Sequence, residues 1–125
     1  MLKDSPHKFI YNLFKFLEKK KGTKTPFNAK LLYAPDELTD KELDIKGDLD
    51  LYGSIISFLP DNLKVEGDLD IGETNITSVP DNLQVEGTLL LDGTPLAEKY
   101  TDEEIVEMVE DKGGYVKGGI TRPYR

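Results

Sequence analysis

The chain contains two copies of one pattern, spaced twenty residues apart. The stretch LPDNLKVEGDLDI, residues 59–71, is followed by VPDNLQVEGTLLL, residues 79–91, and eight of the thirteen positions are identical. In the same phase, GDLDLYGSIISFLPDNLKVE from Gly47 precedes GDLDIGETNITSVPDNLQVE from Gly67, and a third copy begins at Gly87 before the pattern diverges. A fixed period decides the architecture before local propensities are considered, so this repeat is the strongest constraint on the fold.

Each copy joins a strand pattern to an irregular return. Between Leu63 and Ile71, apolar or glycine positions alternate with charged positions, which predicts one half-buried β-strand. Beyond this stretch the apolar spacing becomes irregular, and Pro80, which lacks an amide donor, predicts an arc that returns to the next strand. A unit of this length cannot bury its own apolar side, so neighbouring units are expected to cover one another.

Stacking the copies in phase predicts buried columns of apolar side chains. The columns are Leu49 with Leu69 and Leu89, Leu51 with Ile71 and Leu91, Ile56 with Ile76 and Leu96, and Leu59 with Val79. Parallel strands about 4.8 Å apart, each one coil further along the chain, would carry these columns. The repeat therefore predicts a short right-handed solenoid of parallel β coils.

The repeat resembles that of a known family. The pattern LxLxxTxIxxLPxxL occurs in residues 49–63 and 69–83 and resembles the short bacterial leucine-rich repeat, with Ser54, Thr74 and Thr94 at the position that usually holds asparagine. A hydroxyl at this position is expected to bond the backbone of the turn. The more detailed pattern LPDNLxVEGxLxLxGTxI more closely resembles the repeats of small proteins encoded by bacteriophages, and this resemblance covers residues 41–97. The resemblance implies a solenoid fold and a binding role, without a shared chemistry.

Both ends of the chain are predicted to form helical caps. Ser5 followed by Pro6 is typical of a helix start. Apolar residues then recur at helical spacing: Phe9, Ile10, Leu13, Phe14 and Leu17. Near the other end, Thr101 and Glu104 have the spacing of a capping box, residues 115–120 are expected to add a short last strand, and residues 121–125 are expected to be loose.

We therefore expect an α+β solenoid of leucine-rich-repeat-like parallel β coils, each of about 20 residues, with a helix at each end. Its parts are a basic amphipathic helical cap over residues 1–27, the solenoid over residues 28–100, and a C-terminal helix with a short strand over residues 101–125.

Charge is distributed unevenly along the chain, although the net formal charge is −8. Residues 1–30 carry eight lysines against two acidic residues, whereas residues 31–125 carry eight basic residues against 22 acidic ones. The acidic body disfavours binding to nucleic acid. The basic segment has two interpretations: a cap whose lysines face the acidic body, or a helix that attaches to an anionic membrane or to nucleic acid. Its candidate residues are Lys8, Lys15, Lys19, Lys20 and Lys21.

Acidic residues recur at the outward positions of the predicted strands. The candidate binding residues are Asp48, Asp50, Glu66, Asp68, Asp70 and Glu86. Like charges placed opposite one another destabilise a sheet, so a cationic partner or the chain's own lysines are expected to offset the cost. The alternatives are that these carboxylates keep the sheet soluble and block edge pairing, or that they bind divalent cations weakly.

Residue types that support catalysis are scarce. The chain has no cysteine and one histidine, His7, and it lacks the GxxxxGK[ST] phosphate loop. We therefore expect no enzymatic activity, cofactor, metal or small-molecule substrate. No run approaches the about 20 apolar residues of a membrane span, and no secretory signal is evident, which favours the cytoplasm.

The resulting hypothesis is a non-enzymatic intracellular module that binds a protein with a basic surface. The bacteriophage resemblance implies that this partner is a host protein, including one of antiviral defence. The alternatives are attachment through the basic N-terminal helix and a structural role in a particle.

Overall fold

The computed structural model describes residues 30–31 and 34–125, and the chain forms two compact units, residues 1–39 and 40–125. In the described part of the first unit, residues 30–31 are helical and Pro35–Glu37 form the short 3-10 helix η1. The helical cap expected over residues 1–27 lies outside the described residues. The second unit carries the repeats, and the following description concerns this unit.

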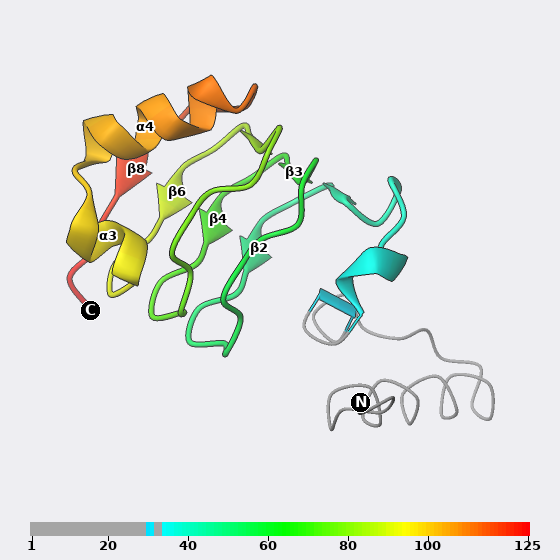
Figure 1. The fold of residues 1–125 in the computed structure, drawn as a ribbon, viewed down its shortest axis with the longest axis horizontal. Helices are drawn as coiled ribbons and strands as arrows, with labels where there is room; N and C mark the ends of the chain where they lie inside the picture. Colours follow the sequence, from blue (N-terminus) through cyan, green and yellow to red (C-terminus); the bar gives the residue numbers. More distant parts are fainter. Residues whose placement is uncertain (1–29, 32–33) are drawn as a thin grey trace, which may run out of the picture. The chain divides into compact units, whose positions relative to one another are not determined.

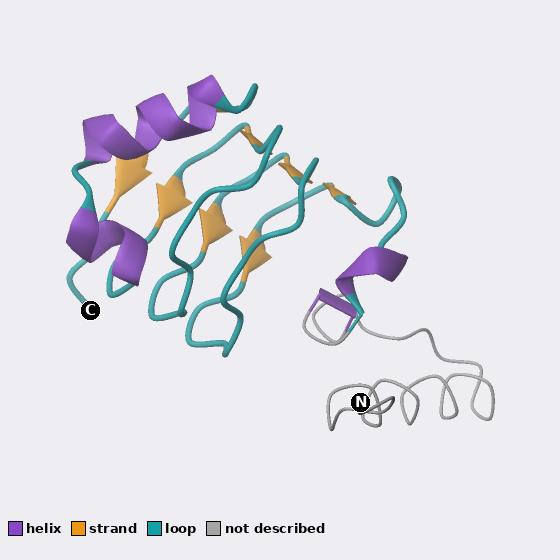
Figure 2. Ribbon diagram, in the orientation of Figure 1, coloured by secondary structure: helices purple, strands orange, loops and turns teal. Residues whose placement is uncertain are grey.

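Residues 40–125 form two parallel sheets of very short strands (Figures 1 and 2). The first sheet has the order β1 (Asp44–Ile45), β3 (Lys64–Val65), β5 (Gln84–Val85) and β7 (Tyr115–Val116). The second has the order β2 (Leu49–Asp50), β4 (Leu69–Asp70), β6 (Leu89–Leu90) and β8 (Ile120–Thr121). Each coil contributes one strand to each sheet, so the chain winds as a solenoid-like parallel β structure.

The strands pair in a constant register until the last coil. Leu49 pairs with Leu69, and Leu69 pairs with Leu89, at intervals of twenty residues. The final pairing joins Leu89 to Ile120 over a longer interval. The extra residues between β6 and β7 form α3 (Pro95–Lys99) and α4 (Asp102–Asp111). Helix α4 contacts β7 and β8, so it lies at the β8 end of the row of strands in Figure 1.

The apolar columns predicted from the repeat form the core. All members of the four columns are buried. The exposed fraction is 0% for Leu69, Leu89, Leu91 and Ile76. Full burial of one such side chain stabilises the folded chain by roughly 1.5–3 kcal/mol. The predicted file of Leu49, Leu69 and Leu89 is confirmed, both in its register and in its burial.

The stretch from Leu63 to Ile71 is not the single strand that its alternation predicts. It contains β3 and β4, which belong to different sheets and are separated by a bend at residues 66–68. Neighbouring coils are in direct backbone contact at this bend, where the Gly87 amide donates to the Gly67 carbonyl oxygen at 3.0 Å. A Cβ atom on Gly87 would lie 2.7 Å from that oxygen. The glycine therefore allows the coils to touch while the chain turns a corner.

Two of the three hydroxyl residues, Thr74 and Thr94, bond the turns as expected, and Ser54 does not. Thr74 Oγ1 donates to the Ile71 carbonyl oxygen at 2.7 Å, and Thr94 Oγ1 donates to the Leu91 carbonyl oxygen at 2.8 Å. Both threonines are buried, so each hydroxyl satisfies a carbonyl that water does not reach. In the described structure, the Ser54 hydroxyl one coil earlier has no hydrogen-bond partner.

Helix α4 begins with the capping box that the sequence predicts. Thr101 Oγ1 accepts from the Glu104 amide at 3.2 Å, and Glu104 Oε1 accepts from the Thr101 amide at 2.9 Å. Two amides at the helix start are thereby satisfied reciprocally, and Ile105 and Val109 are buried on the inner face.

The expectation that residues 121–125 are loose is wrong for the side chains of Arg122 and Arg125, which are held by other parts of the chain. The guanidinium of Arg122 donates to Asp102 Oδ1 at 2.7 Å and to the carbonyl oxygens of Ala97 and Tyr100 at 2.6 and 2.7 Å. Arg125 is also held, by two aspartates. These partners lie at least twenty residues away along the chain, so no local sequence signal reveals them.

Candidate functional site

A polar groove crosses the outer side of strands β1, β3 and β5. One hollow of about 650 Å³ is lined by Asp40, Lys41, Asp44, Asn62, Lys64, Asn82 and Gln84. An adjoining hollow of about 560 Å³ is lined by Asp44, Lys64, Val65, Glu66, Gln84 and Glu86. The two hollows share three residues that are paired in register across the strands, and together they are called the polar groove below. Its lining combines both signs of charge with amide groups.

One rim of the polar groove is an asparagine pair that the sequence analysis did not identify as functional. Asn62 and Asn82 have φ angles of 67° and 55°, and Asn82 Nδ2 donates to Asn62 Oδ1 at 3.0 Å. Asparagine adopts this left-handed conformation more readily than most residues do. The repeated PDN in the sequence is the signal for this rim, because it places the same turn residue on successive coils.

Two of the predicted binding residues, Glu66 and Glu86, line the polar groove. Glu66 Oε2 accepts from Lys46 Nζ at 3.1 Å, and Glu86 Oε1 accepts from Lys117 Nζ at 2.7 Å. The phenol of Tyr115 also donates to Glu86 Oε2. The hydrogen bond from Lys117, followed by that from Tyr115, holds the pKa of Glu86 below its ordinary value. The hydrogen bond to Glu66 raises the pKa of Lys46.

The Tyr115–Glu86 contact predicts a measurable change in a phenol pKa. Glu86 raises the pKa of Tyr115 above its ordinary value of 10.0, because the neutral phenol donates a hydrogen bond to the carboxylate that the ionised phenol could not make. In Glu86→Gln we expect the pKa of Tyr115 to fall toward 10.0. The contribution of this contact to folding is present at neutral pH and is lost as pH rises through the folded pKa of Tyr115.

Ultraviolet titration of tyrosinate in wild type and in Glu86→Gln measures this change, with Tyr115→Phe to isolate the signal of this residue among six tyrosines. Glu73→Gln removes an exposed carboxylate elsewhere and should leave the Tyr115 titration unchanged. An identical titration in wild type and in Glu86→Gln would contradict the contact.

Asp48 and Asp68 face the backbone of the next coil. Asp48 Oδ1 accepts from the Asp68 amide at 2.7 Å, and Asp68 Oδ1 accepts from the Thr88 amide at 2.8 Å. A carboxylate that accepts a backbone N–H makes a charge-assisted hydrogen bond. These bonds offset the repulsion between carboxylates in neighbouring coils, so aligned aspartates do not by themselves require an outside cation.

Asp50 and Asp70 close turns in the second sheet. Asp50 Oδ1 accepts from the Tyr52 amide, and Asp70 Oδ1 accepts from the Gly72 amide, both at 3.0 Å. Asp70 Oδ1 also accepts from Arg125 Nη2 at 2.7 Å, and this hydrogen bond raises the pKa of Arg125 above its already high ordinary value.

The structure thus brings only two of the six predicted acidic residues into the polar groove. Glu66 and Glu86 lie together in the polar groove, whereas the other four are not among its lining residues. The five lysines of the alternative basic helix, Lys8, Lys15, Lys19, Lys20 and Lys21, lie outside the described residues.

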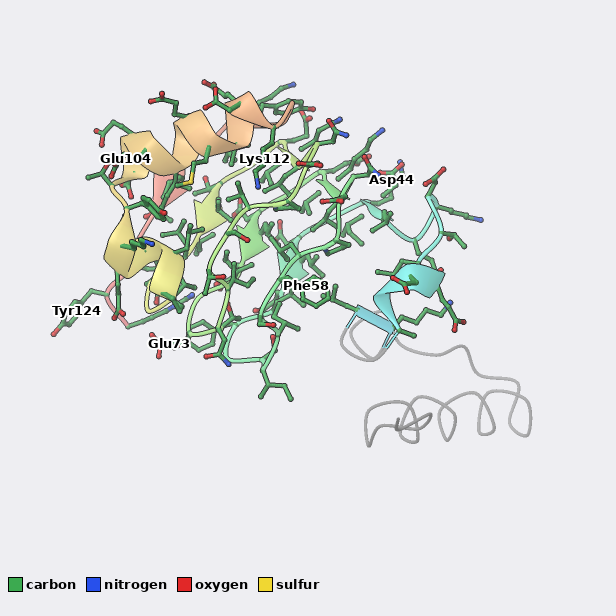
Figure 3. The ribbon with its side chains drawn as sticks, viewed as in Figure 1. Asp44, Phe58, Glu73, Glu104, Lys112 and Tyr124 are labelled. Carbon is green, nitrogen blue, oxygen red and sulfur yellow. The ribbon has the colours of Figure 1, made fainter. Side chains whose placement is uncertain are left out.

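Helix α4 presents a second acidic surface that the sequence analysis treated only as a cap. Its exposed acidic residues are Glu103, Glu104, Glu107, Glu110 and Asp111. Figure 3 labels Glu104 near the first turn of this helix. The signal for this surface was available, because acidic residues recur at helical spacing on the side opposite Ile105 and Val109.

Within residues 30–31 and 34–125, no three His, Cys, Asp or Glu side chains are grouped so that they could hold a metal ion. None of the helices in this part of the chain has the length and apolar character needed to cross a membrane.

Comparison with protein-family models, with curated proteins and with solved structures finds no match to this chain.

Proposed function

We propose that this chain is a non-enzymatic protein-binding module whose polar groove receives a basic segment of a partner protein. In this proposal the fold is a leucine-rich-repeat-like solenoid of twenty-residue coils, closed at one end by α4 with β7 and β8. The observation that carries the proposal is the placement of two carboxylates, Glu66 and Glu86, on successive coils of one polar groove. The stacked strands of solenoid proteins commonly supply such extended binding surfaces.

The lysines that pair with these carboxylates are replaceable. The side chains of Lys46 and Lys117 are 72% and 62% exposed, and the carboxylates that they contact are also well exposed. Exposed ion pairs contribute little to stability, about 0–1 kcal/mol, so a partner's lysine or arginine can take their place at little cost. The surplus of acidic residues, twenty against eight basic ones in residues 40–125, would steer a basic partner toward this unit.

The electrostatics of the groove favour binding over catalysis. A carboxyl group that acts as a general acid needs a raised pKa, and the pKa of Glu86 is lowered by Lys117. Glu66 and Glu86 also lie in an open groove, where water would compete at a reacting centre. The bacteriophage resemblance makes a host protein, met inside the cell, the first partner to test.

The test is quantitative affinity capture with charge-reversed variants of the full chain. Glu66→Lys/Glu86→Lys changes the groove, and Glu103→Lys/Glu110→Lys makes the same change in net charge on exposed positions of α4. Reversal of Asp68 and Asp70 is unsuitable, because both carboxylates bond the protein's own backbone. We expect one captured protein to be retained by wild type and by the α4 variant, and to be lost with the groove variant.

The captured protein is then purified, and its affinity for the three proteins is measured at increasing salt. Equal losses in both variants would show that net charge alone attracts the partner. A partner bound equally by all three proteins would exclude the groove, and the proposal would then be wrong.

A further inference from the structure

The guanidinium of Arg125 lies in a site made by three side chains from different coils. Arg125 Nη2 donates to Asp70 Oδ1 at 2.7 Å and to Asp92 Oδ1 at 3.1 Å, and Nε donates to Asp92 Oδ2 at 3.2 Å. The guanidinium carbon lies 4.1 Å from the centre of the Tyr52 ring. Two carboxylates thus bind the edge of the group while an aromatic ring covers its face.

The shape of this site depends on a missing side chain. Tyr52, Gly72 and Asp92 occupy the same position in successive coils, and the middle one is glycine. A Cβ atom on Gly72 would lie 2.5 Å from Arg125 Nη2 and 2.7 Å from Asp92 Oδ1. The guanidinium therefore lies in space that a side chain at position 72 would have to share.

The chemistry of the site selects arginine over lysine. A guanidinium donates through several N–H groups in one plane and stacks on an aromatic ring, whereas an ammonium is a compact and strongly hydrated charge. Both features of the guanidinium are used here, since Nε and Nη2 reach different oxygens while the ring stacks. The side chains of Asp70 and Asp92 are only 16% and 14% exposed with the guanidinium in place.

We propose that Tyr52, Asp70 and Asp92 form an arginine-binding site, in which Arg125 is the resident ligand and an arginine of the partner protein takes its place. This site is called the arginine cradle below. The inference rests on the proposed function, because it names one kind of basic side chain that the partner presents. It adds a second contact point, on a different sheet from the polar groove.

Arg125 can exchange with another arginine because it is held through its side chain alone. Among the described residues, no backbone hydrogen bond is formed by residues 123–125. The neighbouring Tyr124 is fully exposed, and its side chain points away from the ribbon in Figure 3. An incoming arginine would remake the contacts that Arg125 gives up. The resident group keeps only the advantage of its effective concentration, which is on the order of millimolar for a short flexible tether.

Arg122 shows what a purely structural arginine looks like in the same segment. It donates to two backbone carbonyls at the end of α3, so its removal would leave those carbonyls unpaired. Arg125 contacts carboxylates and a ring instead, and a soluble ligand can supply its group. Arg122 therefore has a structural role, whereas Arg125 occupies a site that another arginine can fill.

The test uses purified full-length protein and a defined probe, the peptide acetyl-Gly-Gly-Arg-Gly-Gly-amide. Binding is followed through the NMR signals of the Gly72 amide and the Tyr52 ring in wild type and in Arg125→Gln. If the cradle is open in about a tenth of wild-type molecules, the variant should bind the peptide about tenfold more tightly. The matching lysine peptide should bind Arg125→Gln several-fold more weakly than the arginine peptide does.

Variants of the cradle, each combined with Arg125→Gln, make the assignment specific. Asp92→Asn and Gly72→Ala should abolish binding of the arginine peptide, because the first removes a carboxylate and the second fills the floor. Asp81→Asn removes one charge from an exposed residue outside the cradle and should leave the affinity unchanged. Circular dichroism and thermal melting confirm that each variant is folded, and loss through Asp92→Asn alone is sufficient if Gly72→Ala is unfolded.

The peptide experiment tests the arginine cradle, and its failure can be distinguished from failure of the proposed function. No saturable shift in Arg125→Gln at about 10 mM peptide, or equal affinities for arginine and lysine peptides, overturns the arginine cradle. Equal affinities of wild type and Arg125→Gln overturn the role of Arg125 as a competing ligand. Either failure leaves the groove experiment intact, and loss of the groove result leaves the peptide measurement intact.

Discussion

Leu69→Ala is expected to lower the free energy of unfolding by about 3 kcal/mol, because the cavity it leaves lies between two fixed coils. Leu69 has no exposed surface and pairs with Leu49 on one side and Leu89 on the other. Backbone hydrogen bonds on both sides, each 2.9 Å long, prevent the coils from moving into the space: Leu49 donates to Asp68, and Leu69 donates to Thr88.

Urea denaturation followed by circular dichroism measures this loss. Leu90→Ala is the matched control, because Leu90 is on β6, paired with β4, and is only half-buried. The control should cost about 1 kcal/mol, in proportion to the smaller apolar area that it exposes. Equal losses of unfolding free energy in the two variants would show that the column of Leu49, Leu69 and Leu89 is not the main source of stability.

Gly87→Ala is expected to destabilise the chain by about 3 kcal/mol, because the new methyl group would overlap the backbone of the preceding coil. The Cβ atom would lie 2.7 Å from the carbonyl oxygen of Gly67 and 2.8 Å from its carbon. Neither atom can rotate away as a side chain can, so the two coils would have to separate. Separation would also strain the hydrogen bond from the Gly87 amide to that oxygen.

Gly47→Ala provides a control at the same position of the repeat. A Cβ atom on Gly47 would meet nothing within 4 Å. Its effect on the free energy of unfolding should stay within about 0.5 kcal/mol, as for most surface substitutions. Thermal and urea denaturation of both variants measure the difference. A Gly87→Ala variant as stable as Gly47→Ala would mean that the coils do not pack as closely as described.

The stacking of the coils could be predicted from the sequence because it depends on a period. Once residues twenty apart are assumed to be neighbours, the file of Leu49, Leu69 and Leu89 follows without knowledge of any angle. The capping box of Thr101 and Glu104 was also predictable, since its partners are three residues apart. Both inferences use distances along the chain that the sequence itself displays.

The bend within each coil could not be predicted in this way. Alternation of buried and exposed positions continues through residues 66–68, so the pattern is the same for one long strand and for two strands at a corner. What distinguishes them is the close contact between Gly67 and Gly87, and that contact depends on backbone positions in three dimensions.

The candidate site was predictable as a surface but not as a set of contacts. The sequence places acidic residues at outward positions, and the structure adds what each carboxylate meets. Glu86 meets Lys117, Asp68 meets a backbone amide, and Asp70 meets Arg125. The last of these partners is fifty-five residues away, in a segment that carries no regular pattern.

The contacts of Arg125 with three other coils depend on how many coils the solenoid contains. Each interior coil repeats the same bonds to its neighbours, so the ladder alone would tolerate duplication of a whole unit. Arg125, however, spans from the last coil to Asp92, Asp70 and Tyr52. In a chain lengthened by one unit, the same side chain would stop one step short of the tyrosine. A chain that gained one coil would therefore keep the contact with Tyr52 only if residues 121–125 changed as well.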